Sequence, residues 1–341
     1  MLRTRYDVIV TIVAVLVGVT FTTHVSADRL GASSSRVIKP RRLQARTTDP
    51  VVTALRIHPN GKWMVTAGDD HVVRIWDINR GTELRRLSGH TDWVDAATFS
   101  PDGNLLATAG KDHRLLLWDL TTGKRTAMVP PGDTAISAIA FSRSGSKLAI
   151  VGFDRSIQIY DVEHQTLMRA LPAPCRDMRC IEFSPDDRLI AGGGRNGKLA
   201  VYDVPSGKQL ALLDAHRQRI RAICFDTDNE QVVTAGEDRY LRAWDTKTFE
   251  LNAELNSDKS KPMSMVSVGP GIIATGGSDN NISIWNLTTM KRQRVLRGHT
   301  GSVVALDTKD GLLVSGSFDA TVRVWSVDDD DVVARTIRST R

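Results

Sequence analysis

The sequence is poor in cysteine and in long apolar runs, and each shortage excludes a class of protein. Three cysteines in 341 residues are too few for a disulfide-dense scaffold. The one long apolar run lies near the N-terminus, which excludes a chain that crosses a membrane several times. The apolar fraction of 41% and the formal net charge of +6 are ordinary, so a disordered chain is also excluded.

The net positive charge belongs to the N-terminal end of the chain. Residues 1–27 carry a net +1 and residues 28–48 a net +5, so the formal +6 of the whole chain leaves residues 49–341 neutral. A nucleic-acid-binding domain needs a basic face, and this bulk charge does not support one. We therefore expect no nucleic-acid partner. We interpret residues 28–48 as a basic linker arm, for which peripheral contact with a membrane or wall polymer is a further hypothesis.

The first 27 residues have the order of a secretory signal peptide. Residues 1–7 carry two arginines, residues 8–21 are almost wholly apolar, and residues 25–27 (Val-Ser-Ala) place small side chains at a cleavage site. The apolar run is shorter than the ~20 residues that span a bilayer. We therefore predict a signal peptide over 1–27 and an exported protein, periplasmic or extracellular. The alternative is an uncleaved segment that anchors the protein to a membrane.

The rest of the chain repeats itself with a period of about 42 residues. An aromatic residue, usually followed by an acid, recurs at spacings of 42, 42, 42, 42, 41 and 40: Trp76-Asp77, Trp118-Asp119, Tyr160-Asp161, Tyr202-Asp203, Trp244-Asp245, Trp285-Asn286 and Trp325-Ser326. Each unit holds four short apolar or alternating segments separated by turns rich in Pro, Gly and Asp. Seven units of four strands without helical periodicity predict an all-β fold, a seven-bladed β-propeller over residues 49–341.

These repeats resemble the WD-repeat (G-beta-like) family of β-propellers. The Gly-His pairs Gly89-His90 and Gly298-His299, together with the Trp-Asp pairs, stand at the family's positions. The resemblance implies a buried network in each complete repeat that links a His, a Ser or Thr, an Asp and the Trp by hydrogen bonds. Three units contain all four residues: His90, Thr108, Asp112 and Trp118; His216, Thr234, Asp238 and Trp244; and His299, Ser315, Asp319 and Trp325.

A catalytic interpretation of these polar residues is not favoured. A set that recurs around a ring is structural, whereas a nucleophile needs an exposed oxygen at one reactive pocket. The glycine-rich segment 192–197 precedes a strand, so no helix N-terminus is available for a nucleotide phosphate. Cys175 and Cys180 have no second pair for a metal, and whether they form a disulfide is left open. We predict a protein that is not an enzyme, with no catalytic residues, cofactor or metal.

The resemblance also implies a binding surface, the face that carries the loops into each first strand and the turns before each third strand. Trp and Arg dominate binding hot spots, and units three to five supply much of the Arg. The candidate residues on this face are Asp92, Trp93, Lys111, Phe153, Arg155, Arg176, Arg195, Arg219, Arg239 and Phe318.

We therefore predict an exported scaffold that binds another protein or an anionic peptide or polymer. One alternative is a propeller enzyme with a site in the central channel, although the innermost strands offer mainly Ala, Ile, Ser, Val and Phe. The other alternative is a structural module of the cell envelope.

Two further expectations concern the ring itself. The seventh unit needs a fourth strand, and residues 332–337 compete with residues 41–46 for that place; the alternation and register of 332–337 favour the C-terminal segment. The fourth unit is expected to be the weakest blade, because it has Gly192, Asn196 and Tyr202 where other units have Ser or Thr, Asp and Trp.

Overall fold

The computed structural model describes residues 35–40, 49–129, 133–228 and 230–326. These residues form strands, turns and loops and contain no helix. Within this described part there is accordingly no helix of the length and apolarity that a membrane crossing requires. The predicted signal peptide and most of the predicted linker arm lie outside the described residues.

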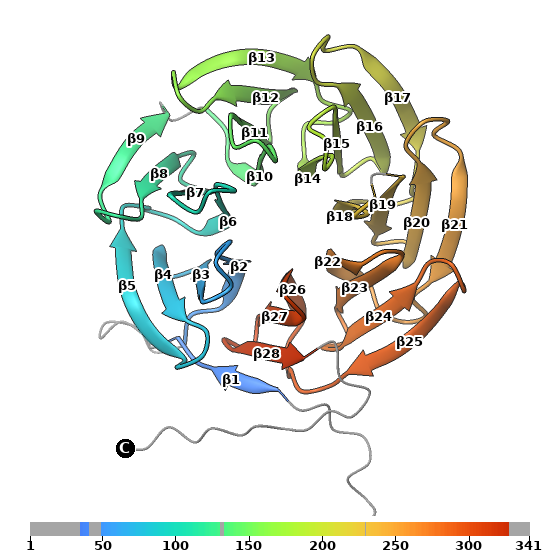
Figure 1. The fold of residues 1–341 in the computed structure, drawn as a ribbon. Helices are drawn as coiled ribbons and strands as arrows, with labels where there is room; N and C mark the ends of the chain where they lie inside the picture. Colours follow the sequence, from blue (N-terminus) through green and yellow to red (C-terminus); the bar gives the residue numbers. More distant parts are fainter. Residues whose placement is uncertain (1–34, 41–48, 130–132, 229, 327–341) are drawn as a thin grey trace, which may run out of the picture. The chain divides into compact units, whose positions relative to one another are not determined.

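Seven four-stranded antiparallel sheets are arranged as the blades of a ring (Figure 1). Blade 1 comprises β2 (Val52–Ile57), β3 (Trp63–Gly68), β4 (Val72–Asp77) and β5 (Thr82–Ser88). Blade 2 comprises β6 (Val94–Phe99), β7 (Leu105–Gly110), β8 (Leu115–Asp119) and β9 (Arg125–Val129). Blade 3 comprises β10 (Ile136–Phe141), β11 (Lys147–Gly152), β12 (Ser156–Asp161) and β13 (Thr166–Pro172). Blade 4 comprises β14 (Met178–Phe183), β15 (Leu189–Gly194), β16 (Lys198–Asp203) and β17 (Gln209–Asp214).

The remaining three blades have the same plan. Blade 5 comprises β18 (Ile220–Phe225), β19 (Gln231–Gly236), β20 (Tyr240–Asp245) and β21 (Leu251–Asn256). Blade 6 comprises β22 (Pro262–Gly269), β23 (Ile272–Gly277), β24 (Ile282–Asn286) and β25 (Lys291–Leu296). Blade 7 comprises β26 (Val303–Lys309), β27 (Leu312–Ser317), β28 (Val322–Ser326) and β1 (Arg36–Ile38). The predicted all-β, seven-bladed propeller is therefore confirmed.

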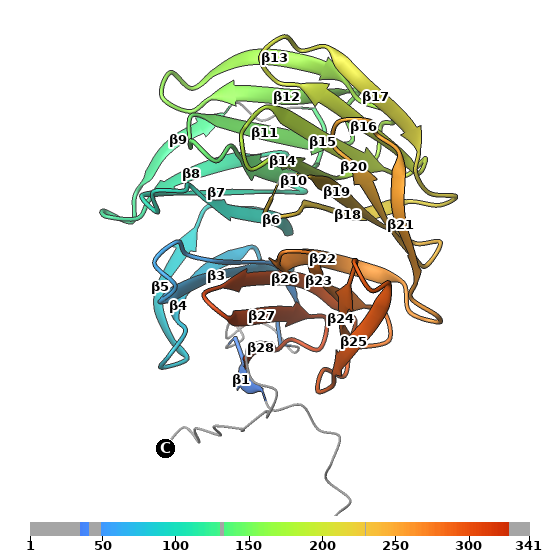
Figure 2. The ribbon, with the colours of Figure 1, turned by 45° about the vertical axis from the view of Figure 1, so that its right-hand side comes forward.

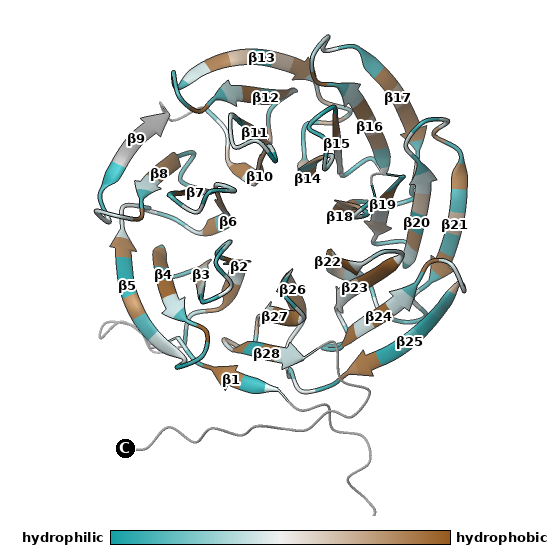
Figure 3. Cartoon of the chain, viewed as in Figure 1, coloured by the Kyte–Doolittle hydropathy of each residue, from teal (hydrophilic) through white to brown (hydrophobic). Residues whose placement is uncertain are grey.

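Burial changes from the axis of the ring to its rim. The second strand of a blade, such as β7, is buried along nearly its whole length because both of its faces pack against neighbouring blades. The outermost strands alternate between exposed and buried positions, as β5 does, and carry more polar residues (Figure 3). The core is therefore a series of apolar layers between adjacent blades. In one of them Val73 and Leu87 of blade 1 pack in a cluster with Leu106 and Trp118 of blade 2.

A glycine ends the second strand of several blades for a steric reason. A Cβ on Gly110 would lie 1.9 Å from the Trp93 carbonyl oxygen, and one on Gly68 would lie 1.8 Å from the Val51 carbonyl oxygen. The first strand approaches so closely here that no side chain can be accommodated. This close approach holds the loop into the first strand against the blade.

The N-terminal segment, and not residues 332–337, provides the fourth strand of blade 7. Strand β1 pairs antiparallel with β28, with Arg36 opposite Val324 and Ile38 opposite Val322 (Figure 2). The favoured C-terminal closure is therefore wrong, and residues 332–337 lie outside the described residues. Residues 36–38, which were predicted to belong to the linker arm, are therefore part of the propeller. The alternative prediction of an N-terminal closing strand had the correct end of the chain, but it put that strand at residues 41–46 instead of 36–38. The N-terminal strand takes this place because it buries an apolar side chain. Ile38 is only 4% exposed and completes the apolar layer between blades 7 and 1.

Candidate functional site

The three predicted four-residue networks are joined by hydrogen bonds. In blade 2, His90 Nδ1 lies 2.9 Å from Asp112 Oδ2 and His90 Nε2 lies 2.8 Å from Thr108 Oγ1. Trp118 Nε1 donates to the same hydroxyl at 2.9 Å. An indole N–H can only donate, so a consistent arrangement has the Thr108 hydroxyl donating to His90 Nε2, and His90 Nδ1–H donating to Asp112. Burial lowers the pKa of His90, in keeping with a neutral ring.

The same geometry recurs in blades 5 and 7. His216 contacts Asp238 and Thr234 at 2.8 Å each, and Trp244 Nε1 donates to Thr234 at 3.1 Å. In blade 7 the corresponding residues are His299, Asp319, Ser315 and Trp325. Burial alone would raise the pKa of Asp319, but hydrogen bonds from His299 and Thr321 outweigh it and lower that pKa. Because the aspartate also accepts a backbone N–H of the loop that enters the first strand, each network holds that loop in place.

Other blades replace the network in different ways. Blade 1 has a buried ion pair between Arg74 and Asp70 and keeps the bond from Trp76 Nε1 to Thr66 at 2.8 Å. In blade 4 there is no hydroxyl at Gly192. A Cβ there would lie 2.8 Å from the Met178 methyl group, so the methionine occupies the place of the missing side chain.

The predicted binding face carries exposed aromatic side chains. We call this the top face, formed by the loops into each first strand and the turns before each third strand. Trp93, Phe153 and Phe318 are 38%, 42% and 47% exposed. The Lys111 ammonium lies 3.7 Å from the centre of the Trp93 ring, and the Arg179 guanidinium lies 5.0 Å from the centre of the Phe153 ring. These cation–π contacts orient both rings on the face.

The arginines of the top face form two groups. Arg155, Arg176, Arg195 and Arg239 are exposed. Arg219 is half-buried and forms ion pairs with Asp177 and Glu237, both at 3.2 Å. The predicted partner-binding residues thus lie on one face, but Arg219 is engaged within the protein.

Sequence reasoning missed two arginines that extend this ion-pair network. Arg179 pairs with Asp177 at 2.6 Å, and Arg221 pairs with Glu237. Burial would raise the pKa of Glu237, but Arg221 and Arg219 together lower it. The repeat could have pointed to them, because Arg179 and Arg221 are one 42-residue period apart and hold the same position at the start of their innermost strands.

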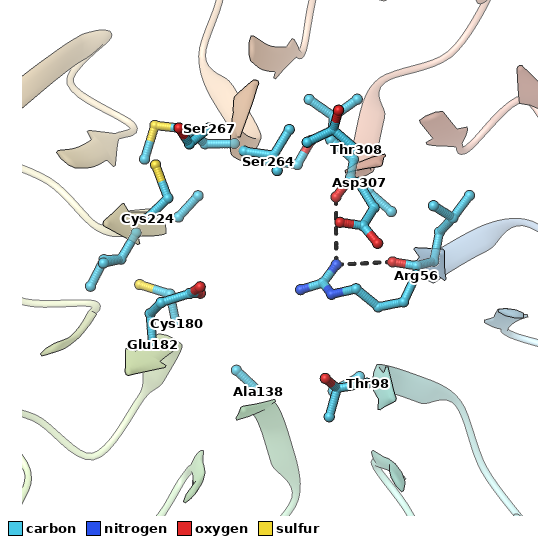
Figure 4. Close-up of a pocket in the computed structure, with 18 of the residues that line it drawn as sticks. Arg56, Thr98, Ala138, Cys180, Glu182, Cys224, Ser264, Ser267, Asp307 and Thr308 are labelled. Carbon is cyan, nitrogen blue, oxygen red and sulfur yellow. Dashed lines mark hydrogen bonds between the residues drawn. The ribbon is translucent and has the colours of Figure 1, made fainter. Parts of the chain in front are cut away.

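The central channel is a second concave region. Its cavity of about 730 Å³ is lined by residues from β2, β6, β10, β14, β18, β22 and β26, the first strand of every blade (Figure 4). Charged residues that sequence reasoning did not single out line it, among them Arg56, Glu182 and Asp307. Each stands just before the turn that ends its innermost strand, so the repeat period could have identified them. The expectation that these strands offer mainly small or apolar residues was incomplete.

Other candidate chemistry has little support among the described residues. Cys175, Cys180 and Cys224 are free thiols, and burial raises the pKa of Cys180 and Cys224, so neither is a reactive thiolate. No cluster of three or more His, Cys, Asp or Glu side chains within the described ranges could hold a metal ion.

A ring of seven similar blades with buried networks beneath one face defines a repeat-built β-propeller. The chain belongs to the WD domain, G-beta repeat family. The family model matches residues 39–77, 81–119, 125–161, 165–203, 207–245 and 290–326. The stretch between the last two matches nevertheless forms the same strands in the structure. There Trp285 donates to Thr275 at 2.8 Å, and Ser260, in place of a histidine, donates to Asp279 at 2.6 Å.

Similar proteins share short segments with this chain. It is 46% identical over 56 residues to a phospholipase A-2-activating protein of Xenopus laevis, which is 16% of this chain and 7% of that protein. It is 39% identical over 57 residues to mitochondrial division protein 1 of Pyricularia oryzae, 17% of this chain and 9% of that protein. It is 40% identical over 50 residues to the probable serine/threonine-protein kinase PkwA of Thermomonospora curvata, 15% of this chain and 7% of that protein. The matched segments thus span less than a tenth of these relatives.

Proposed function

We propose that this protein is a non-enzymatic scaffold that binds another protein on the top face of the propeller. Membership of the WD-repeat family supports a protein partner in general terms. The observation that carries the proposal is the exposure of Trp93, Phe153 and Phe318 on this one face. Large aromatic side chains supply most of the binding energy in protein interfaces, and here the buried networks hold the loops that present Trp93 and Phe318.

The charge of the face indicates which kind of partner segment it prefers. Four exposed arginines lie on the middle blades: Arg155, Arg176, Arg195 and Arg239. The nearby acids Asp177 and Glu237 are already paired with other arginines, namely Arg179, Arg219 and Arg221. The four exposed guanidinium groups therefore remain available to carboxylate or phosphate groups. We propose that the partner presents an acidic peptide segment to this face.

We also propose that the protein acts outside the cytoplasm, in the periplasm or the extracellular space. The support is the sequence order of residues 1–27: a charged start, an apolar run and small residues at a cleavage site. N-terminal sequencing of the protein recovered from cell fractions tests this. A chain that starts near Asp28 in the exported fraction is expected, and a chain that starts at Met1 in the cytoplasm would overturn the proposal.

A binding assay with matched variants tests the partner surface. The full chain is titrated with a fluorescent Glu-Gly repeat peptide and, for comparison, a Lys-Gly repeat peptide. We expect preference for the acidic peptide. The triple change of Arg155, Arg195 and Arg239 to Gln should weaken its binding by about tenfold or more. Control changes of Arg80, Arg188 and Lys208 to Gln remove the same charge from exposed residues elsewhere and should have little effect.

A second comparison tests the aromatic residues. Protein partners captured by the full chain from its own cell fraction should be lost when Trp93, Phe153 and Phe318 are changed to Ala together. The matched control changes Leu84, Leu167 and Leu251, which lie on the outer strands and are at least as exposed, to Ala. Equal loss in both triple variants, or no loss in the first, would contradict binding by the top face.

A further inference from the structure

The central channel contains charges that the protein-binding role does not use. The cavity runs from the starts of the innermost strands to the turns that follow them, where Pro59, Pro101 and Pro185 line it. The cavity meets the top face at Arg179 and Arg221, whereas Arg56, Glu182 and Asp307 lie toward the opposite ends of their strands, away from the exposed aromatic residues. An interior cavity of this volume is large enough for a small molecule.

Arg56 presents unused hydrogen-bond donors to this cavity. Its Nη1 donates to the Leu55 carbonyl oxygen at 2.9 Å and approaches the Leu306 carbonyl oxygen at 3.5 Å. Within the described residues no carboxylate forms an ion pair with this guanidinium. The neighbouring Asp307 is occupied with the backbone, because its Oδ2 accepts the Ile57 N–H at 2.6 Å. The rest of the planar guanidinium faces the open channel (Figure 4).

Glu182 presents an uncompensated acid from another wall. Its carboxyl group points into the channel in Figure 4, and the described part of the chain gives it neither a hydrogen bond nor an ion pair. Burial raises the pKa of this carboxyl group to about 7. The negative charge of Asp307 adds to that rise, whereas the positive charges of Arg56 and Arg143 lower the pKa by less than burial raises it. A carboxyl group left in this state is one that a bound cation would stabilise in its charged form.

We propose that the channel binds a small zwitterion, a molecule with one carboxylate and one ammonium group, whose carboxylate pairs with Arg56 and whose ammonium pairs with Glu182. Among the charged residues that line the cavity, Arg56 and Glu182 form no ion pair with each other or with another described residue, so a ligand with one charge of each sign satisfies both. Ser264, Ser267 and Thr308 also line the cavity. Each hydroxyl donates to a backbone carbonyl, and its oxygen can accept a further hydrogen bond.

Singly charged ligands match the channel less well. A simple carboxylate would satisfy Arg56 but would add negative charge beside Glu182 and Asp307. A simple amine would satisfy Glu182 but would leave the Arg56 donors unused and add positive charge to the channel. Each charge of a zwitterion instead meets an opposite charge on the wall. Among zwitterions of different length, the one whose charge separation matches the distance between Arg56 and Glu182 should bind best.

Isothermal titration calorimetry on the full chain tests this inference with glycine, β-alanine and γ-aminobutyrate, which differ in the number of methylene groups that separate their two charges. Propionate and propylamine serve as singly charged comparisons. At least one of the three zwitterions should bind about tenfold or more tightly than both singly charged compounds. The isosteric change Glu182→Gln and the change Arg56→Gln should each reduce that affinity by about tenfold or more, whereas Thr98→Ala, a neutral change on the same wall, should not.

Several results would overturn the inference. One is that none of the three zwitterions binds. Another is that propionate or propylamine binds as tightly as the best zwitterion. A third is that Glu182→Gln leaves the affinity for that zwitterion unchanged. If Arg56→Gln does not fold, Arg56→Lys keeps the positive charge but loses the planar fork, and an intermediate affinity is expected. Unchanged affinity in that variant would argue against contact with Arg56. None of these measurements depends on a partner at the top face, so the two proposals stand or fall separately.

Discussion

Arg36 of β1 lies opposite Val324 of β28, in the register position that an arginine also holds in other blades. Arg85 lies opposite Ile75 in blade 1 and Arg169 opposite Ile159 in blade 3. Each of these arginines donates to backbone carbonyls of the next blade: Arg36 to Ile78 at 2.9 Å, Arg85 to Leu120 at 2.9 Å and Arg169 to Ser206 at 2.8 Å. The N-terminal strand thus reproduces the contacts of an ordinary fourth strand.

The first prediction concerns closure of the ring. Ile38→Ala should destabilise the protein by about 2–4 kcal/mol, because the buried side chain fills the layer between blades 7 and 1. The control Val37→Ala alters the adjacent, exposed side chain and should cost far less. Chemical denaturation of the full chain measures both. Similar midpoints for the two variants would show that β1 does not contribute to the folded ring in solution.

The second prediction concerns the buried network of blade 2. Thr108→Val keeps the shape of the side chain but removes the hydroxyl group that both His90 and Trp118 contact. Two buried polar groups then lose their partner, and the unfolding free energy should fall by about 2–4 kcal/mol. Thr121→Val, on an exposed turn of the same blade, is the control. A loss confined to a few tenths of a kcal/mol would mean that water replaces the hydroxyl group.

The third prediction is a pH dependence caused by Glu182. The pKa of its carboxyl group is about 7 in the folded chain, against about 4.3 when unfolded, because burial outweighs the attraction of Arg56 and Arg143. The folded state therefore binds more protons between these values, and stability falls as pH rises through this window. Glu182→Gln should have little effect on stability near pH 4 and should become increasingly stabilising up to about pH 7.

Urea denaturation at several pH values measures this difference between Glu182→Gln and the unchanged chain. Asp310→Asn, which alters an exposed carboxylate that also lines the cavity, is measured beside it as the control. A stabilising effect that shrinks as pH rises would contradict the assigned direction of the pKa shift.

The fourth prediction concerns local opening of blade 4. Tyr202 bonds to the Pro172 carbonyl and to Gln209, and Asn196 bonds to the Pro174 carbonyl, so neither joins a histidine-centred network. Hydrogen exchange should therefore show residues 188–203 opening before residues 230–246 of blade 5, which contain an intact network. Equal protection of the two segments would show that the packing of Met178 against Gly192 compensates for the missing bonds.

The sequence by itself determined the number of blades, their order and the members of the three buried networks. These features depend on spacing within one repeat, and the recurrence of Trp118 and its equivalents every 40 to 42 residues makes that spacing visible. The side chains of one network, such as His90, Thr108 and Trp118, are brought together by strand pairing inside one blade and its entering loop. Local patterning was therefore sufficient for them.

Only the tertiary structure decided which terminus closes the ring and which charges share the channel. Strand β1 is three residues long and shows little alternation, so its place is set by pairing with β28 at the far end of the chain and by burial of Ile38. Arg56, Glu182 and Asp307 come from blades 1, 4 and 7 and face one cavity only because the seven blades form a closed ring. Contacts between residues so distant in sequence depend on that closure, which no pattern within a single repeat encodes.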